Sequence, residues 1–301
     1  MILTLTAPRE GQTVRDAARR ELLVSASMLR RLKAADAIHV NGERAFADRR
    51  LAAGDTLTLD LAAAEPPCGL VPEQGPVDVL WEIEGLLAVN KPCGTIVHPT
   101  RSRYTGTLSN FVAGRLPEHV CHAVNRLDRD TSGVVLFAEN AYWKDLASRA
   151  LDESGEKAYL ALVFGMPAPL SGTVDAPIAR ESPNALRRIV SDGGQRAVTH
   201  YETLASYGEY SLVLLRLDTG RTHQIRVHMQ HIGCPVLGDG LYRTEASAAL
   251  SARLGLAAQA LHAQTLAFTL PFGRGPVTVT APVKRPDFLA AARSLGFAEP
   301  L

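Results

Sequence analysis

One short stretch of the chain, residues 124–133, combines two arginines and two aspartates with apolar neighbours. It is followed at once by the apolar run 134–138. Charged residues between segments that resemble buried strands indicate a loop, and loops on a rigid scaffold commonly carry binding or catalytic groups. An aspartate in such a loop could act as a nucleophile. A solvated turn closed by Asx-type hydrogen bonds is the alternative interpretation.

A second cluster of reactive residue types follows Gly220. Residues 219–229 resemble a turn that enters a helix, with Thr222 as the expected N-cap and Gly233 as the stop. His223 and Arg226 are three residues apart, so both can face the same side of that helix. A surface helix with a salt-bridged arginine is the alternative interpretation.

Two other patterns suggest different chemistry but are incomplete. Residues 218–220 are similar to the active-site triplet of aspartic peptidases, which need two carboxylates sharing a proton, yet no second copy of the triplet occurs. His228, His231 and Cys234 are evenly spaced by three, as metal ligands can be. Because Gly233 is expected to end the helix, Cys234 should not share the face of the two histidines.

The composition indicates a globular, cytoplasmic protein. The 301 residues are 46% apolar, enough for one large domain or two smaller ones. No run approaches the roughly 18 apolar residues of a membrane span, and residues 1–12 do not resemble a signal peptide. A net charge of +1 does not by itself mark a nucleic-acid binder, so RNA contacts would need local arginine clusters. The cysteines are widely spaced and form no Cys-x-x-Cys pair: Cys68, Cys93, Cys121 and Cys234.

The elements that must position these residues fall into two groups. The first group contains two helices, at 13–23 and from Ser25 or Ser27 to Leu32, followed by strands at 38–40 and 56–59. Residues 63–76 are rich in proline and glycine and are typical of a linker. Beyond it, strands are expected at 77–81, 86–89, 157–165, 197–204, 210–217, 262–270 and 277–281, and helices at 107–116, 140–151 and near 286–295.

Residues 126–133, with Arg-Leu-Asp followed by Thr-Ser-Gly, resemble the signature of the RluA-type pseudouridine synthases. The stretches at 90–94 and 98–99 are also similar to this family, and the resemblance covers about residues 77–290. It implies that Asp128 is the catalytic nucleophile, that Tyr159 is the active-site tyrosine of its Lys-x-Tyr setting, and that Arg226 pairs with the aspartate. One position departs, because the family usually has histidine where this chain has Asn125.

The first group of elements resembles the S4 RNA-binding domain over about residues 12–62. The likeness depends on Ser25, Ser27, the Arg30–Arg31 pair, the Val-Asn-Gly turn at 40–42 and the Gly-Asp pair at 54–55. Ala26 and Asp36 depart from the family pattern. The resemblance implies an S4-like RNA-binding domain at 1–62, a linker at 63–76 and a catalytic domain at 77–301. Its candidate RNA contacts are Arg15, Arg19, Arg30 and Arg31.

Together the resemblances imply an α+β protein, with a small S4-like domain followed by a mixed, mainly antiparallel β-sheet domain. The implied reaction isomerises uridine to pseudouridine in structured RNA, ribosomal RNA more than transfer RNA. Nothing is oxidised and no group is lost, so neither a cofactor nor a metal is required. A monomer is expected. An RNA-binding protein that has lost catalysis is the alternative, and intact Asp128, Tyr159 and Arg226 speak against it.

The aspartate could attack the sugar or the base, and the sequence leaves both open. A nearby guanidinium of Arg226 would keep the carboxylate ionised. Uridine stacked in RNA is out of reach, so the base must be flipped out or already unpaired. Arg126 could then occupy the vacated stack, or it could form a structural salt bridge instead.

Overall fold

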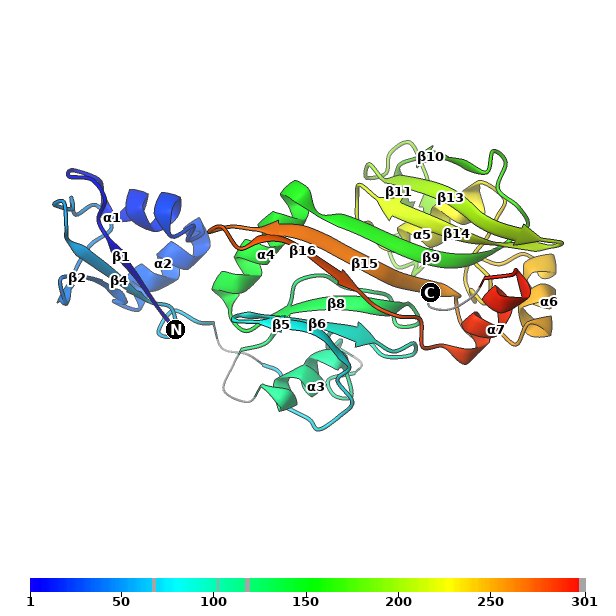
Figure 1. Ribbon diagram of the computed structural model, residues 1–301, viewed down its shortest axis with the longest axis horizontal. Coiled ribbons are helices and arrows are strands. Elements are labelled where there is room, and N and C mark those ends of the chain that lie inside the picture. Colours follow the sequence, from blue (N-terminus) through cyan, green and yellow to red (C-terminus); the bar gives the residue numbers. More distant parts are fainter. Residues whose placement is uncertain (67–68, 102, 117–119, 298–301) are drawn as a thin grey trace.

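A computed structural model describes residues 1–66, 69–101, 103–116 and 120–297. A small unit of sheet and helices lies at one end of the molecule, and a long twisted sheet with helices on both faces forms the rest (Figure 1). No described helix is long and apolar enough to span a membrane.

The small unit contains the two helical segments and the two strands expected from the sequence, with two further strands, β1 and β3. Its sheet runs β1-β4-β2-β3. The sequence did not indicate β1, and the first expected helix is a short α-turn that continues as a π-helix. Thr13 and Ser25 cap the two helical segments by accepting hydrogen bonds from backbone N–H groups. The elements are β1 (Ile2–Thr6), α1 (Val14–Asp16), π-helix η1 (Ala17–Glu21), α2 (Ala26–Ala34), β2 (Ile38–Val40), β3 (Glu43–Arg44) and β4 (Thr56–Asp60).

The large unit is built on a mixed, mainly antiparallel sheet, which confirms the predicted fold class. Its order is β10-β13-β14-β9-β15-β8-β6-β5, with β16 on β15 and β7 on β8. Among the described strands, only β8 and β15 pair in parallel. The strands are β5 (Val79–Ile83), β6 (Leu86–Lys91), β7 (His122–Ala123), β8 (Ser132–Ala138), β9 (Glu156–Phe164), β10 (Ser171–Asp175), β13 (Val198–Tyr207), β14 (Tyr210–Leu217), β15 (Leu261–Leu270) and β16 (Gly275–Thr280); β11 (Ile178–Arg180) and β12 (Arg188–Val190) form a separate hairpin.

Helices cover both faces of this sheet, which explains why β6 and β8 are apolar on both sides. In one half, α3 (Leu108–Arg115) packs on one face and α4 (Ala141–Ser154) on the other. In the other half, α5 (Gln224–His231) lies opposite α6 (Glu245–Arg253) and α7 (Pro286–Ser294). The sequence did not indicate α6 or the strands β10 to β12.

The start of α5 differs from the expectation. Thr222 is not its N-cap: that position is His223, which has a left-handed backbone with φ of 60° and makes no side-chain cap hydrogen bond. The first turn is instead closed by Gln224, whose Oε1 accepts hydrogen bonds from Thr219 Oγ1 and the Arg221 N–H. A non-glycine residue in this region is uncommon and often marks a functional site.

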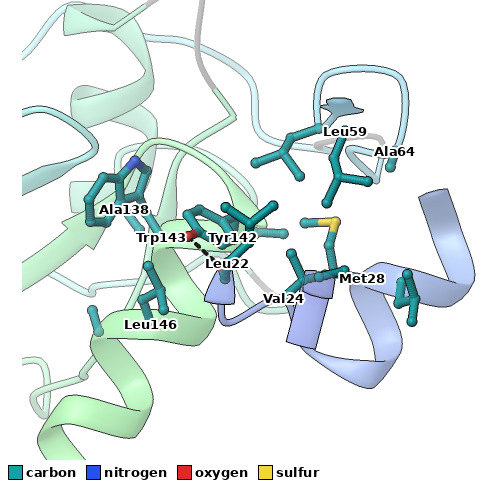
Figure 2. Close-up of a cluster of buried hydrophobic side chains, with 14 of the residues drawn as sticks. Leu22, Val24, Met28, Leu59, Ala64, Ala138, Tyr142, Trp143 and Leu146 are labelled. Carbon is teal, nitrogen blue, oxygen red and sulfur yellow. Dashed lines mark hydrogen bonds between the residues drawn. The ribbon is translucent and has the colours of Figure 1, made fainter. Parts of the chain in front are cut away.

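The small unit shares a hydrophobic core with the large one. Leu22, Val24 and Met28 lie in the same buried cluster as Tyr142 and Trp143 of α4, as Figure 2 shows. Tyr142 Oη donates a hydrogen bond to Leu22 O at 2.8 Å, and Arg149 Nη2 donates to Leu23 O at 2.6 Å. The two units are therefore packed together through α4.

The segment expected to be a linker is irregular where described, yet it is held in place. Ala64 is buried, and Glu65 accepts hydrogen bonds from the Ala141 N–H at the start of α4. Further along, Asn110 Nδ2 of α3 donates to Val71 O, and the Glu73 N–H donates to Asn110 O. These contacts fix the path between the two units.

This packing predicts coupled unfolding. Leu22→Ala should destabilise the chain by about 2–3 kcal/mol, since it removes buried methyl groups from the shared core. Both tryptophans, Trp81 and Trp143, belong to the large unit, so their fluorescence in a denaturant titration reports on that unit. Its midpoint should fall with the substitution. Leu170→Ala, which truncates an exposed leucine, should leave the midpoint in place. An unchanged midpoint in Leu22→Ala would mean that the units unfold independently.

Candidate active site

Asp128 lies in the loop between β7 and β8, and buried polar groups fix this loop. Lys91, fully buried at the end of β6, donates hydrogen bonds from Nζ to Thr95 O and Arg129 O at 2.8 Å each and to Pro92 O at 3.0 Å. Burial lowers the pKa of Lys91 to about 8, with the nearby acidic groups acting in the opposite direction. One lysine thus joins the turn after β6 to the loop that carries Asp128.

The end of the loop is fixed where β8 meets β15. Gly133 pairs with Ala263, and a Cβ on Gly133 would lie 2.1 Å from Ala263 O, so the close approach requires glycine. Thr131 Oγ1 accepts a hydrogen bond from Gln259 Nε2 at 2.6 Å. Asn125, the position that departs from the family pattern, accepts from the Leu136 N–H and donates to Val134 O. It therefore fastens the loop to β8.

Arg226 on α5 holds two carboxylates at once. Nη1 donates to Asp128 Oδ2 at 2.8 Å, while Nε and Nη2 donate to the two oxygens of Asp239 at 2.5 and 2.9 Å. Asp239 also accepts hydrogen bonds from the backbone N–H groups of Leu241 and Tyr242. The bidentate pair with Asp239 sets the plane of the guanidinium, and that plane directs Nη1 at Asp128.

The two aspartates differ in exposure, and this difference separates their roles. The side chain of Asp239 is 0% exposed, whereas that of Asp128 is 29% exposed. Burial alone would raise the pKa of Asp239, but the hydrogen bonds and charge of Arg226 outweigh it and lower that pKa. Burial likewise opposes the charge of Arg226, yet Asp239 and Asp128 raise its pKa. Asp239 is thus a buried counter-ion, and Asp128 is open to a substrate.

Tyr242 and His223 support the same arginine. The ring of Tyr242 is fully buried beneath Arg226, with 5.0 Å from the guanidinium carbon to the ring centroid. Tyr242 Oη accepts a hydrogen bond from the Arg188 N–H and lies 2.9 Å from His223 Nδ1. Burial lowers the pKa of His223. Its Nε2 lies 3.8 Å from Asp128 Oδ2.

Tyr159 of β9 lines the same cavity as Asp128. Burial raises the pKa of Tyr159 to about 12, and the negative charge of Asp128 adds to the effect. The phenol therefore stays protonated and neutral at physiological pH. Its flat ring offers an apolar face beside a carboxylate, as a bound base would require.

These groups surround an open cavity of about 90 Å³. The structure brings together all three predicted catalytic residues and Arg126, which lies at the rim and donates a hydrogen bond to Thr222 Oγ1 at 2.9 Å. The side chain of Arg126 is exposed and forms no salt bridge with the other described residues. Lining residues are Arg126, Leu127, Asp128, Thr131, Tyr159, Leu217, Gly220, Arg221, Thr222, His223, Gln224, Ile225, Arg226 and Leu261.

The arginines of the small unit are not part of this cavity. Arg15, Arg19 and Arg30 are exposed on α1, η1 and α2. Arg31 differs from them because it is partly buried, and its Nε donates a hydrogen bond to Ala64 O at 3.1 Å. That contact gives Arg31 a structural role at the turn that follows β4, in contrast to the surface position that its sequence context suggested.

Sequence reasoning missed Asp239, Lys91 and Tyr242 as site residues. Asp239 lies between two glycines, Gly238 and Gly240, in a stretch that has no helical or strand periodicity. A lone carboxylate in such a turn was a signal, but nothing local connects it to Arg226. Lys91 lies in a stretch already noted for its likeness to the family, although its full burial depends on the tertiary fold.

The competing chemistries find no site in the described structure. His228 is buried, with Nδ1 2.9 Å from Thr199 Oγ1 and Nε2 2.9 Å from Ala176 O, so both nitrogens are occupied. Within the described residues, no group of three or more His, Cys, Asp or Glu side chains could hold a metal ion. Asp218 is exposed and pairs with the imidazole of His200, whereas an aspartic peptidase needs a second carboxylate that shares a proton.

Comparisons with known proteins identify the class of this fold and site. A profile of the RNA pseudouridylate synthase family matches residues 85–231, which include Asp128, Tyr159 and Arg226. Two solved human proteins, RNA pseudouridylate synthase domain containing 4 and 1, have TM-scores of 0.59 and 0.58. They are 26% and 25% identical to this chain and cover 74% and 76% of it, and the match spans 95% and 99% of their own chains.

Curated relatives give the same result at higher identity. The chain is 36% identical over 251 residues to an uncharacterised RNA pseudouridine synthase of Bacillus subtilis, covering 80% of this chain and 82% of that protein. It is 37% identical over 268 residues to the ribosomal large subunit pseudouridine synthase D of Xanthomonas campestris, covering 84% and 79%. The chain belongs to the RNA pseudouridine synthase family. It isomerises uridine to pseudouridine in RNA.

The Arg226–Asp239 pair generates a prediction. Asp239→Asn keeps the shape of the side chain but removes the charge, so that the partly exposed Asp128 is the remaining described counter-ion of Arg226. We expect a loss of about 1–3 kcal/mol in unfolding free energy and a fall in kcat of ~10–100-fold, because the guanidinium is no longer held in one plane. Tritium release from uridine-labelled RNA and a denaturant titration measure the two effects.

Asp218→Asn serves as the control, since it removes an equal charge from an exposed pair with His200. It should alter neither quantity. A kcat for Asp239→Asn equal to that of the unmodified chain would show that Asp239 does not position Arg226 for the reaction.

Proposed function

We propose that Asp128 is the nucleophile of the isomerisation, with Arg226 as the residue that positions it and Tyr159 as the ring against which the base lies. The observation that carries this proposal is the shared guanidinium: Arg226 is held by a wholly buried carboxylate and donates its remaining edge to a carboxylate that solvent reaches. Such a carboxylate is negatively charged, oriented and accessible, as a nucleophile must be.

The reaction is an isomerisation in which the atoms balance without a cofactor. The bond between the sugar and the base nitrogen breaks, a bond from the sugar to a base carbon forms, and the proton lost from that carbon is matched by one gained at nitrogen. Asp128 could add to the sugar or to the base during this exchange. In either route the neutral phenol of Tyr159 stays close to the rotating base and adds no second negative charge.

Entry of a base into this cavity requires that it leave its stack in the RNA. Arg126 lies at the rim, exposed, with its guanidinium near Thr222. We propose that this side chain occupies the space that the flipped uridine vacates. A planar guanidinium can stack on the neighbouring bases and carries a charge suited to the strand.

Substitution of the nucleophile tests the central assignment. Asp128→Asn should reduce tritium release from uridine-labelled RNA by at least about 10³-fold while RNA binding persists, because the amide keeps the shape but cannot act as a nucleophile. Asp130→Asn is a matched control two residues away, since Asp130 pairs with Arg129 and not with Arg226. It should retain most of the activity. Substantial turnover by Asp128→Asn would rule out nucleophilic attack by this residue.

We further propose that the substrate is ribosomal RNA. Support comes from relatives that carry the name ribosomal large subunit pseudouridine synthase D, in Xanthomonas campestris and, at 42% identity, in Zymomonas mobilis. We further propose that the enzyme acts in the cytoplasm, where ribosomal RNA is found, and that it acts as a monomer. Mapping pseudouridines in ribosomal and transfer RNA from a deletion strain tests the substrate: a missing modification in transfer RNA alone would exclude ribosomal RNA.

The S4-like unit at 1–62 is proposed to bind RNA through its exposed arginines, Arg15, Arg19 and Arg30. These three side chains are exposed, so they remain available to phosphates. Arg31 is left out of this set because it holds Ala64 O. Deletion of the unit is a poor test, since it would expose Tyr142 and its neighbours in the shared core.

The triple substitution Arg15→Ala, Arg19→Ala and Arg30→Ala is the sharper test. Each lost phosphate contact should flatten the log-log salt dependence of RNA binding by roughly 0.7–0.9. Arg44→Ala is the control in the same unit, because Arg44 is exposed but paired with Asp36. It should leave the slope unchanged. A triple variant with the salt slope of the unmodified chain would show that the unit does not bind RNA through these residues.

A further inference from the structure

A basic hollow lies beside the catalytic cavity, at the hairpin of β11 and β12. It has a volume of about 290 Å³, and its walls carry Arg180, Arg188 and Arg221. Arg180 ends β11, Arg188 begins β12, and Arg221 precedes α5, so three separate segments converge on it. Gly194 packs against the backbone of Ile178, where a Cβ would lie 2.6 Å from the carbonyl carbon. That close approach holds the rim of the hollow against β11.

Each of the three guanidinium groups donates one hydrogen bond in the described structure, so further N–H donors remain available to a ligand. Arg180 Nη1 donates to Pro183 O, Arg188 Nη1 to Ala185 O and Arg221 Nε to Arg196 O. All three acceptors are neutral carbonyls, and in the described structure none of these arginines forms an ion pair with a carboxylate. Their neighbour Arg187, by contrast, pairs with Glu181. The hollow therefore carries uncompensated positive charge.

The hollow adjoins the catalytic cavity. Arg221 and Thr222 line both, and Thr222 Oγ1 also accepts the hydrogen bond of Arg126 at the rim of the cavity. The backbone of Arg188 also contacts the site, since its N–H donates a hydrogen bond to Tyr242 Oη. A strand with one nucleotide in the catalytic cavity would thus extend directly over the hollow.

We propose that this hollow binds a backbone phosphate of the RNA strand next to the target uridine. The inference rests on the proposed function, because it needs a flipped uridine in the cavity of Asp128. Planar guanidinium groups bind phosphate oxygens in pairs, and several of them around one hollow suit a phosphodiester better than a base edge. Such a contact fixes the register of the strand without reading its sequence.

The test uses the full chain and a short fluorescein-labelled oligouridine, with binding measured by anisotropy at several salt concentrations. Arg180→Gln should weaken binding at least about 10-fold and flatten the salt slope by ~0.7, the value for one phosphate of a single strand. Arg180→Lys should keep the slope, since it keeps the charge, while losing part of the affinity. Arg253→Gln removes an equal charge from an exposed pair with Glu209 and should change neither.

A scan with neutral methylphosphonate linkages identifies the phosphate. For the protein without a substitution, a methylphosphonate at one linkage of the oligouridine should weaken binding about 10-fold. The affinity of Arg180→Gln should not change when the same linkage is replaced. Equal sensitivity of both proteins at every linkage would overturn the proposal, as would unchanged affinity in Arg180→Gln or an oligouridine that fails to bind the unmodified chain. The assignment of ribosomal RNA is tested separately by mapping, so the two can fail independently.

Discussion

A buried guanidinium that must satisfy two carboxylates is the interaction on which the site depends. Arg226 is buried among α5, Tyr242 and the turn after Gly238, and a charge in such a place is tolerated only when it is paired and hydrogen-bonded. Asp239 supplies this pairing with both oxygens. Because its geometry is bidentate, the guanidinium has one orientation, and its remaining edge meets Asp128 at 2.8 Å.

This arrangement divides one electrostatic task between two residues of the same type. Asp239 is wholly buried and holds Arg226 in place, whereas Asp128 is partly exposed and is held in place by Arg226. A single carboxylate could not do both, since the oxygens that hold a guanidinium in plane are unavailable to a substrate. The neighbouring aromatic groups follow from the same need: the ring of Tyr242 packs against the guanidinium of Arg226, and its hydroxyl lies 2.9 Å from Nδ1 of His223, beside Asp128.

The sheet brings these residues together at the place where its two halves meet. The loop of Asp128 enters β8, while Tyr159 and Arg226 come from β9 and α5 of the other half. The parallel contact of β8 with β15 joins the halves, and only glycine at position 133 permits that approach. Lys91 then fixes the loop from beneath, with backbone carbonyls as its acceptors. The loop that carries Asp128 is thus fixed by the joint between β8 and β15 and by a buried lysine.

The sequence by itself determined the elements and the exposed half of the site. Local patterns indicated most strands and helices and the stretches that contain Asp128, Tyr159 and Arg226, because periodicity and short motifs depend on neighbours along the chain. Only the tertiary structure decided which partners are buried: Asp239 behind Arg226, Lys91 under the loop, Ala64 opposite Arg31 and the shared core around Tyr142. These contacts join residues far apart in sequence, and the strength of a charged contact depends on the burial that the complete fold creates.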